Sequence, residues 1–171
     1  MITFQVGEKV VYPNHGVAVV ENISSRAFAG QQERFYLLKL SGNSMTVMVP
    51  FSHAADLRLR KVTRNGDLAR VVQFLGEGRT RRYTDWKDRF KENSERMADG
   101  SLLAVAEVLK SLLELQAQAK VLSFREKKML DRARHMLITE LATSRAMTEV
   151  DAIAVFDKAL SKASLRFPEA M

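Results

Sequence analysis

One tryptophan among cations is the feature of this sequence with the clearest chemical potential. Trp86 is the only tryptophan in 171 residues, and it lies in the segment Arg81-Arg82-Tyr83-Thr84-Asp85-Trp86-Lys87-Asp88-Arg89-Phe90-Lys91. Lysine and arginine side chains hold a protein on the DNA backbone without reading its sequence. A large apolar ring can then insert between base steps and unstack them. The alternative is a core tryptophan, because Trp86 shares a helical face with two other aromatic residues, Tyr83 and Phe90.

A second group of cations has helical spacing. Arg125, Lys128, Arg132 and His135 recur at i, i+3, i+7 and i+10, which places them along one face of a helix. We call these four residues the basic stripe. Such a face is often only solvated, but acidic residues are nearly absent from this one. We interpret it as a track for a phosphate backbone and expect a salt dependence equivalent to about 3–5 phosphates.

The charge balance agrees with a polyanionic partner. Twenty-seven basic and 20 acidic residues give a net charge of +7, which favours a nucleic acid or another polyanion. The charge is concentrated in two stretches. Residues 79–97 contain seven basic and four acidic groups, and residues 120–135 contain six and two.

Other classes of function have no support in the sequence. The chain has no cysteine, and its three histidines are far apart, so we expect neither a disulfide nor a metal site. We find no nucleophile–base pattern, no P-loop and no HExxH motif, and His15 fits a surface turn. No catalytic residue, cofactor or small-molecule substrate is therefore expected. The sequence also lacks a membrane span and a signal-peptide pattern, so a cytoplasmic protein is expected.

The first 60 residues have the pattern of a small sheet. Short β-branched or aromatic runs alternate with turn signals such as Pro13-Asn14-His15-Gly16. Their close spacing leaves no room for crossover helices, which predicts about five antiparallel strands in a bent sheet or partly open barrel. In the last run, Met45, Val47 and Val49 should be core, while Thr46 and Met48 face outward near a strand edge. That edge could accept a partner strand, or it could be an ordinary solvated strand.

From about residue 66 the hydrophobic period becomes helical. The first apolar face runs from Leu68 to Leu75, the second includes Tyr83, Trp86 and Phe90, and the third begins after Asp99-Gly100-Ser101. A capping box, Ser123 with Glu126, begins a fourth helix, and Thr148 begins a fifth. The sequence thus predicts an α+β fold with two domains: a β domain over residues 1–62 and an all-α helical bundle over residues 66–166.

Three segments resemble the CarD/CdnL family of bacterial RNA polymerase-binding transcription regulators. They are Phe4-Gln5-Val6-Gly7-Glu8-Lys9-Val10-Val11-Tyr12-Pro13-Asn14-His15-Gly16-Val17, the tryptophan segment Thr84–Asn93, and Leu122–Arg134. They occur in the family's order and spacing over nearly the whole chain. Transcription-repair coupling factors carry a module like the first segment, but this chain has the helical half and no helicase motor.

The resemblance implies a Tudor-like N-terminal domain that binds the lobe of the RNA polymerase β subunit. It also implies a helical domain that lies on promoter DNA at the upstream edge of the bubble, where a tryptophan wedge stabilises the open complex. By position, Trp86 is the wedge. The expected DNA-binding residues are Trp86, Lys87, Arg89, Lys91, Arg125, Lys128 and Arg132, and the expected polymerase-binding residues are Arg26, Thr46, Met48 and Pro50. Some family members have Arg where this chain has Asp88 or Met48.

The resulting hypothesis is a cytoplasmic, nucleoid-associated regulator that acts as a monomer and is not an enzyme. Its main rival is a protein-interaction adaptor that binds polymerase but not DNA. A sequence-specific repressor is a further alternative, although no recognition helix for the major groove is evident. A structural RNA-binding protein is another. A salt-dependent affinity for DNA without operator preference would separate the first hypothesis from the adaptor and the repressor.

Overall fold

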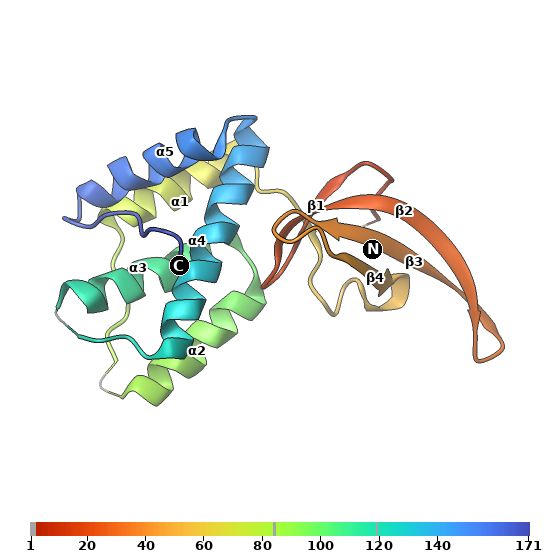
Figure 1. Ribbon diagram of the computed structural model, residues 1–171, viewed down its shortest axis with the longest axis horizontal. Coiled ribbons are helices and arrows are strands. Elements are labelled where there is room, and N and C mark those ends of the chain that lie inside the picture. Colours follow the sequence, from red (N-terminus) through yellow and green to blue (C-terminus); the bar gives the residue numbers. More distant parts are fainter. Residues whose placement is uncertain (1–2, 84, 119) are drawn as a thin grey trace.

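The computed structural model describes residues 3–83, 85–118 and 120–171, and over these residues a β-sheet is followed by a helical bundle (Figure 1). Thr84 of the tryptophan segment lies outside the described residues. The strands are β1 Lys9–Tyr12, β2 Gly16–Phe28, β3 Gln31–Leu40, β4 Thr46–Pro50 and β5 Arg60–Lys61, with a short 3-10 helix at Phe51–His53. The helices are α1 Asn65–Glu77, α2 Trp86–Asp99, α3 Leu102–Ala117, α4 Phe124–Arg145 and α5 Glu149–Ser161. The predicted α+β fold is confirmed.

The sheet is antiparallel throughout, as the short connections between its strands require. Its strand order is β4-β3-β2-β1-β5, which makes β4 an edge strand. The long β2–β3 hairpin reaches away from the helices (Figure 1). Side chains alternate between the two faces of a sheet, and Tyr36, Leu38 and Val49 are buried on one face.

One residue of the β4 run departs from the alternation that the sequence predicts. Met45 was expected in the core, but it precedes β4 and is 55% exposed. Its N–H donates to the side-chain oxygen of Asn43 at 3.0 Å, so Met45 belongs to the β3–β4 turn and not to the strand. Val49 of the same run is buried as predicted.

The helix starts are fixed by the residues that the sequence indicated. The N–H of Glu126 donates to the hydroxyl of Ser123, and the N–H of Ser123 donates to the carboxylate of Glu126, both at 3.2 Å. This is the predicted capping box at the start of α4. Thr148 caps α5 in the simpler way, by accepting from the N–H of Asp151 at 3.1 Å. None of the helices described is both long and apolar enough to cross a membrane.

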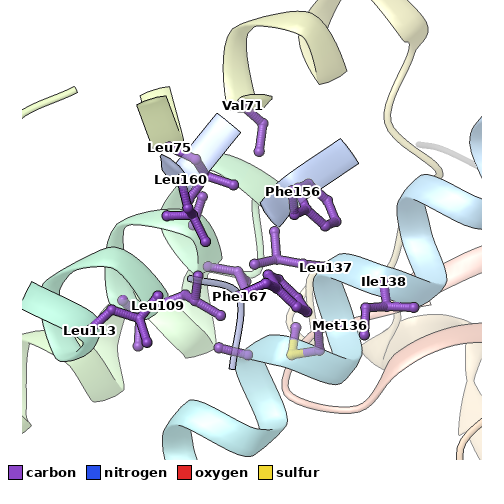
Figure 2. Close-up of a cluster of buried hydrophobic side chains, with 14 of the residues drawn as sticks. Val71, Leu75, Leu109, Leu113, Met136, Leu137, Ile138, Phe156, Leu160 and Phe167 are labelled. Carbon is purple, nitrogen blue, oxygen red and sulfur yellow. The ribbon is translucent and has the colours of Figure 1, made fainter. Parts of the chain in front are cut away.

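The core of the bundle is formed where α1, α3, α4 and α5 meet (Figure 2). Leu109, Leu137 and Leu160, one from each of three helices, are fully buried there. A residue beyond the last helix completes the core, because the ring of Phe167 stacks on that of Phe156 with centroids 5.5 Å apart. Burial of this apolar surface is the main stabilising contribution to the bundle.

A buried lysine fixes α1 against α3. Lys110 is 2% exposed, and its Nζ donates to the carbonyl oxygens of Phe74 and Gly78 at 3.0 and 2.7 Å. Those carbonyls lie at the C-terminal end of α1, where a cation is favoured by the helix dipole. Burial lowers the pKa of Lys110, and nearby Glu114 partly offsets that effect. This cation therefore has a structural position and is not part of the surface charge.

Candidate nucleic-acid interface

Trp86 lies at the surface of the bundle. It is the first residue of α2, and its side chain is 51% exposed. Asp85 caps the helix by accepting from the N–H of Lys87 at 3.1 Å. At the other end of α2, Met97 is 2% exposed and holds the helix in the core. The alternative interpretation of Trp86 as a core residue is therefore wrong.

The core interpretation rested on Tyr83, Trp86 and Phe90 sharing one face of a helix, and the structure does not show that face. α2 begins at Trp86, so Tyr83 precedes it. The hydroxyl of Tyr83 accepts from Nη2 of Arg96 at 2.9 Å. The pKa of Tyr83 is raised by burial and by its contact with Glu92, while Arg96 acts in the opposite direction. Tyr83 thus packs back along α2 and leaves its first residue uncovered.

Arg89, expected to bind phosphate, instead makes an ion pair within the protein. Its Nε and Nη2 donate to the two carboxylate oxygens of Glu126, at 2.7 and 3.1 Å. The side chains are 12% and 2% exposed. Burial alone would raise the pKa of Glu126, but the hydrogen bonds from Arg89 and Ser123 outweigh it, and the pKa is lowered. This pair argues against the predicted phosphate contact, and it joins the first turns of α2 and α4.

The other cations expected to bind DNA are free at the surface. They lie on the early turns of α2 and along α4, and all are exposed: Lys87, Lys91, Arg125, Lys128 and Arg132. Among the described residues none of the five forms an ion pair with a carboxylate. Their charges are therefore available to an external anion.

The last member of the basic stripe is not part of this surface. His135 is half-buried and faces the β3–β4 turn, where a Cβ added at Gly42 would lie 2.7 Å from its Nε2. The nearby His15 has a lowered pKa because of burial and the positive charge of Arg132. The stripe thus exposes three cations and ends at the junction between the bundle and the sheet.

An exposed aromatic residue that the sequence analysis overlooked lies beside these cations. Phe124 is the first residue of α4 and is 65% exposed, with Nζ of Lys128 located 4.7 Å from the centroid of its ring. Trp86 and Phe124 therefore occupy equivalent positions, at the start of two helices that Arg89 and Glu126 hold together. The position of Phe124 in the sequence could have indicated this. It lies between the capping residue Ser123 and Arg125, and it is not one of the residues on the apolar face of its helix.

The residues expected to bind polymerase share one face of the sheet. The register places Met48 opposite Leu37, Pro50 opposite Phe35, and Arg26 opposite Glu33, and these odd-numbered β3 residues all point away from the core. Met48 is 37% exposed, and Thr46 and Arg26 are also exposed. Half-buried Phe35 and Leu37 also lie on this face. The sequence did not indicate them, because the segment Phe35–Leu40 is apolar at nearly every position and does not show which side of the strand is covered. We call this face the outer sheet face; it consists of Arg26, Phe35, Leu37, Thr46, Met48 and Pro50.

The described residues contain no group of three acidic or histidine side chains that could hold a metal ion. The arrangement instead presents an exposed ring, unpaired cations and a partly apolar sheet face. Such groups are suited to binding.

Comparison with known proteins places this arrangement in a family. The CarD-like/TRCF RID domain matches residues 4–63, and the CarD C-terminal domain matches residues 70–157. A protein of Bacillus subtilis (strain 168) named "Putative transcription factor YdeB" is 34% identical over 146 residues, which cover 85% of this chain and 95% of that protein. The solved structure "CdnLNt from Myxoccoccus xanthus" is 35% identical and covers 36% of this chain and 87% of its own, with a TM-score of 0.32.

The chain belongs to the CarD family of transcription factors. The resemblance inferred from the three sequence segments is thereby confirmed, and the family is one of transcription regulators.

Proposed function

We propose that this protein binds RNA polymerase through its outer sheet face and stabilises the promoter open complex by inserting Trp86 at the upstream edge of the bubble. It does so as a monomer, without a cofactor and without reading base sequence. The observation that carries the proposal is the exposure of Trp86, half of whose surface is in solvent at the start of α2. Exposed cations that form no ion pair among the described residues lie on the early turns of α2 and along α4, whose first turn is joined to that of α2 by Arg89 and Glu126.

The physical basis is differential binding. A protein shifts the equilibrium between closed and open DNA only if it binds the open form more tightly. Cations bind the backbone in both forms and add affinity without preference. An indole ring that fills the gap at an unstacked base step contacts only the open form, and it offsets part of the few kcal/mol that unstacking costs.

The polymerase contact is proposed from the sheet. The matched family domain and the exposed edge strand β4 both support it. Strand addition at such an edge would give affinity through main-chain hydrogen bonds, while alternate side chains would give specificity. Met48 and Thr46 are the alternate exposed side chains of β4, and Pro50 ends the same strand. Arg26 lies on the same outer sheet face but on β2, with β3 between it and β4. The partner surface we propose is the lobe of the β subunit.

The test is the lifetime of the open complex on a promoter, with wild-type protein and with Trp86→Ala. We expect the substitution to shorten the lifetime about tenfold, which corresponds to the loss of 1.4 kcal/mol. Trp86→Phe should have an intermediate effect, because a smaller ring fills less of the gap. Val150→Ala is the matched control: Val150 is 76% exposed on α5, and its loss should not alter the lifetime.

Equal lifetimes for wild type and a correctly folded Trp86→Ala would refute the wedge. Polymerase binding together with no salt-dependent affinity for DNA would identify the protein as an adaptor instead.

A further inference from the structure

A buried carboxylate on α4 joins the two parts of the molecule. Glu140 is 2% exposed, and its two oxygens accept from Nη1 and Nη2 of Arg60, each at 2.7 Å. The same carboxylate accepts from the N–H of Thr63 at 2.8 Å and from the Thr63 hydroxyl. Arg60 belongs to β5 and Thr63 to the connection between β5 and α1. One side chain of the bundle therefore binds both the last strand and the segment that leaves it.

Arg60 extends these contacts to α2. Its Nε and Nη2 donate to the carbonyl oxygen of Gly100 at 2.9 and 2.8 Å. Gly100 ends α2 with a φ of 79°, a conformation that favours glycine. It also lies directly under the β1–β2 turn, where a Cβ would be 2.6 Å from Cγ of Pro13. The C-terminal end of α2 thus contacts the sheet at two places, through Arg60 and through Pro13.

We propose that Arg60, Thr63, Gly100 and Glu140 form a junction latch that keeps the sheet and the bundle in one fixed orientation, and that this orientation positions Trp86. α2 connects the latch to the tryptophan, because Trp86 is its first residue and Gly100 follows its last. Fourteen helical residues span about 20 Å. The Arg89–Glu126 pair holds the far end of the same helix. The inference rests on the proposed function, since it gives that function its geometry.

Fixed orientation matters because the protein is proposed to bind two surfaces of one complex. If the parts were hinged, contact with polymerase would not place Trp86 at a defined base step, and the joint would have to be ordered when the second surface binds. A rigid connection that matches the distance between the two sites removes that cost. The latch is therefore a positioning device: it touches neither polymerase nor DNA.

The test compares Glu140→Gln with wild type in two independent measurements. The first is ¹⁵N relaxation of the free protein, where wild type should tumble as one body and Glu140→Gln should give shorter correlation times for the sheet and the bundle separately. The second is open-complex lifetime, which we expect the variant to shorten on the order of tenfold. Its affinity for β lobe alone and for forked DNA alone should not change, a combination that general loss of folding would not produce.

The matched control is Arg58→Ala. Arg58 pairs with Asp99 at 2.8 Å across the same junction, but both side chains are about half exposed, so this pair should contribute little to the orientation. If Glu140→Gln does not fold, Thr63→Val removes a hydroxyl that donates to the Glu140 carboxylate without changing a charge, and the same measurements apply.

Separate tumbling of the two parts in wild type would overturn the latch, as would an unchanged lifetime in a variant whose parts tumble separately. Failure of the proposed function looks different: Trp86→Ala would leave the lifetime unchanged whatever the tumbling shows.

Discussion

Trp86 keeps half of its ring in water although burial of a large apolar side chain would stabilise the fold by about 1.5–3 kcal/mol. The bundle does not use that energy, because Asp85 caps α2 just before the tryptophan and Tyr83 turns back toward Arg96. An exposed indole next to unpaired cations has a chemical use in binding nucleic acid, where its face stacks on bases.

At the scale of single residues we predict that each exposed cation of the basic stripe accounts for about one phosphate. Alanine at Arg125, Lys128 or Arg132 should lower the slope of log Kd against log salt concentration by about 0.9, measured on forked duplex DNA. His135→Ala should leave the slope unchanged, because that side chain faces the β3–β4 turn. Lys158→Ala, an exposed lysine of α5, is the control. A slope insensitive to all three substitutions would remove α4 from the DNA surface.

At the scale of elements, the start of α2 is stabilised through the start of α4. Glu126 is shared between its own capping box and Arg89 of the neighbouring helix. The two exposed aromatic residues are therefore held in a fixed relation by Glu126, and no sequence motif connects this residue with Arg89.

We predict that Glu126→Gln lowers the free energy of unfolding by about 3–5 kcal/mol at pH 7, the usual cost of breaking a buried ion pair by removing one partner. Because the pKa of Glu126 is lowered in the folded protein, this contribution is complete above the unfolded value of about 4.3 and declines as pH falls below it. The gap between wild type and variant in urea unfolding should thus narrow at acidic pH. An undiminished gap at pH 3 would contradict this account.

The outer sheet face allows a second prediction for an element. Met48→Glu or Arg26→Glu should weaken binding to the β lobe at least tenfold, because a carboxylate would replace an apolar or cationic contact, while DNA affinity stays the same. Met45→Glu is the matched control, since Met45 is 55% exposed but belongs to the turn and not to this face. Pull-down of the lobe by Met48→Glu and Arg26→Glu at wild-type level would refute the assignment.

At the scale of the whole molecule, the proposed function requires both surfaces to act on one complex. We predict that Trp86→Ala and Met48→Glu are not additive in open-complex lifetime. At limiting protein concentration, little of the Met48→Glu variant should be bound to polymerase. Removal of the Trp86 ring from that variant should therefore have almost no further effect on the lifetime. The four lifetimes of the double-mutant cycle measure this coupling. Strict additivity would show that the ring and the sheet act independently.

The sequence correctly predicted the structural features that depend on residues close together along the chain. The helix caps at Ser123 and Thr148, the antiparallel sheet and the outward position of Met48 all follow from local spacing. It failed where a side chain is fixed by a residue distant along the chain. Arg89 looked like a free cation until the fold placed Glu126, 37 positions away, against it. Arg60 and Glu140 are 80 positions apart, and no periodicity connects them.

Phe167, which completes the core beyond α5, has a practical consequence for anyone who shortens this chain. Its N–H donates to Asp157 at 2.9 Å, and the next carbonyl, that of Pro168, accepts from Nε of Arg134 at 2.7 Å. Trimming before residue 165 would uncover the ring of Phe156 and leave an aspartate and an arginine without partners. A protein shortened in this way would stabilise the open complex less well because its helical bundle is destabilised. That loss would then be mistaken for evidence that the C-terminal residues have a regulatory role.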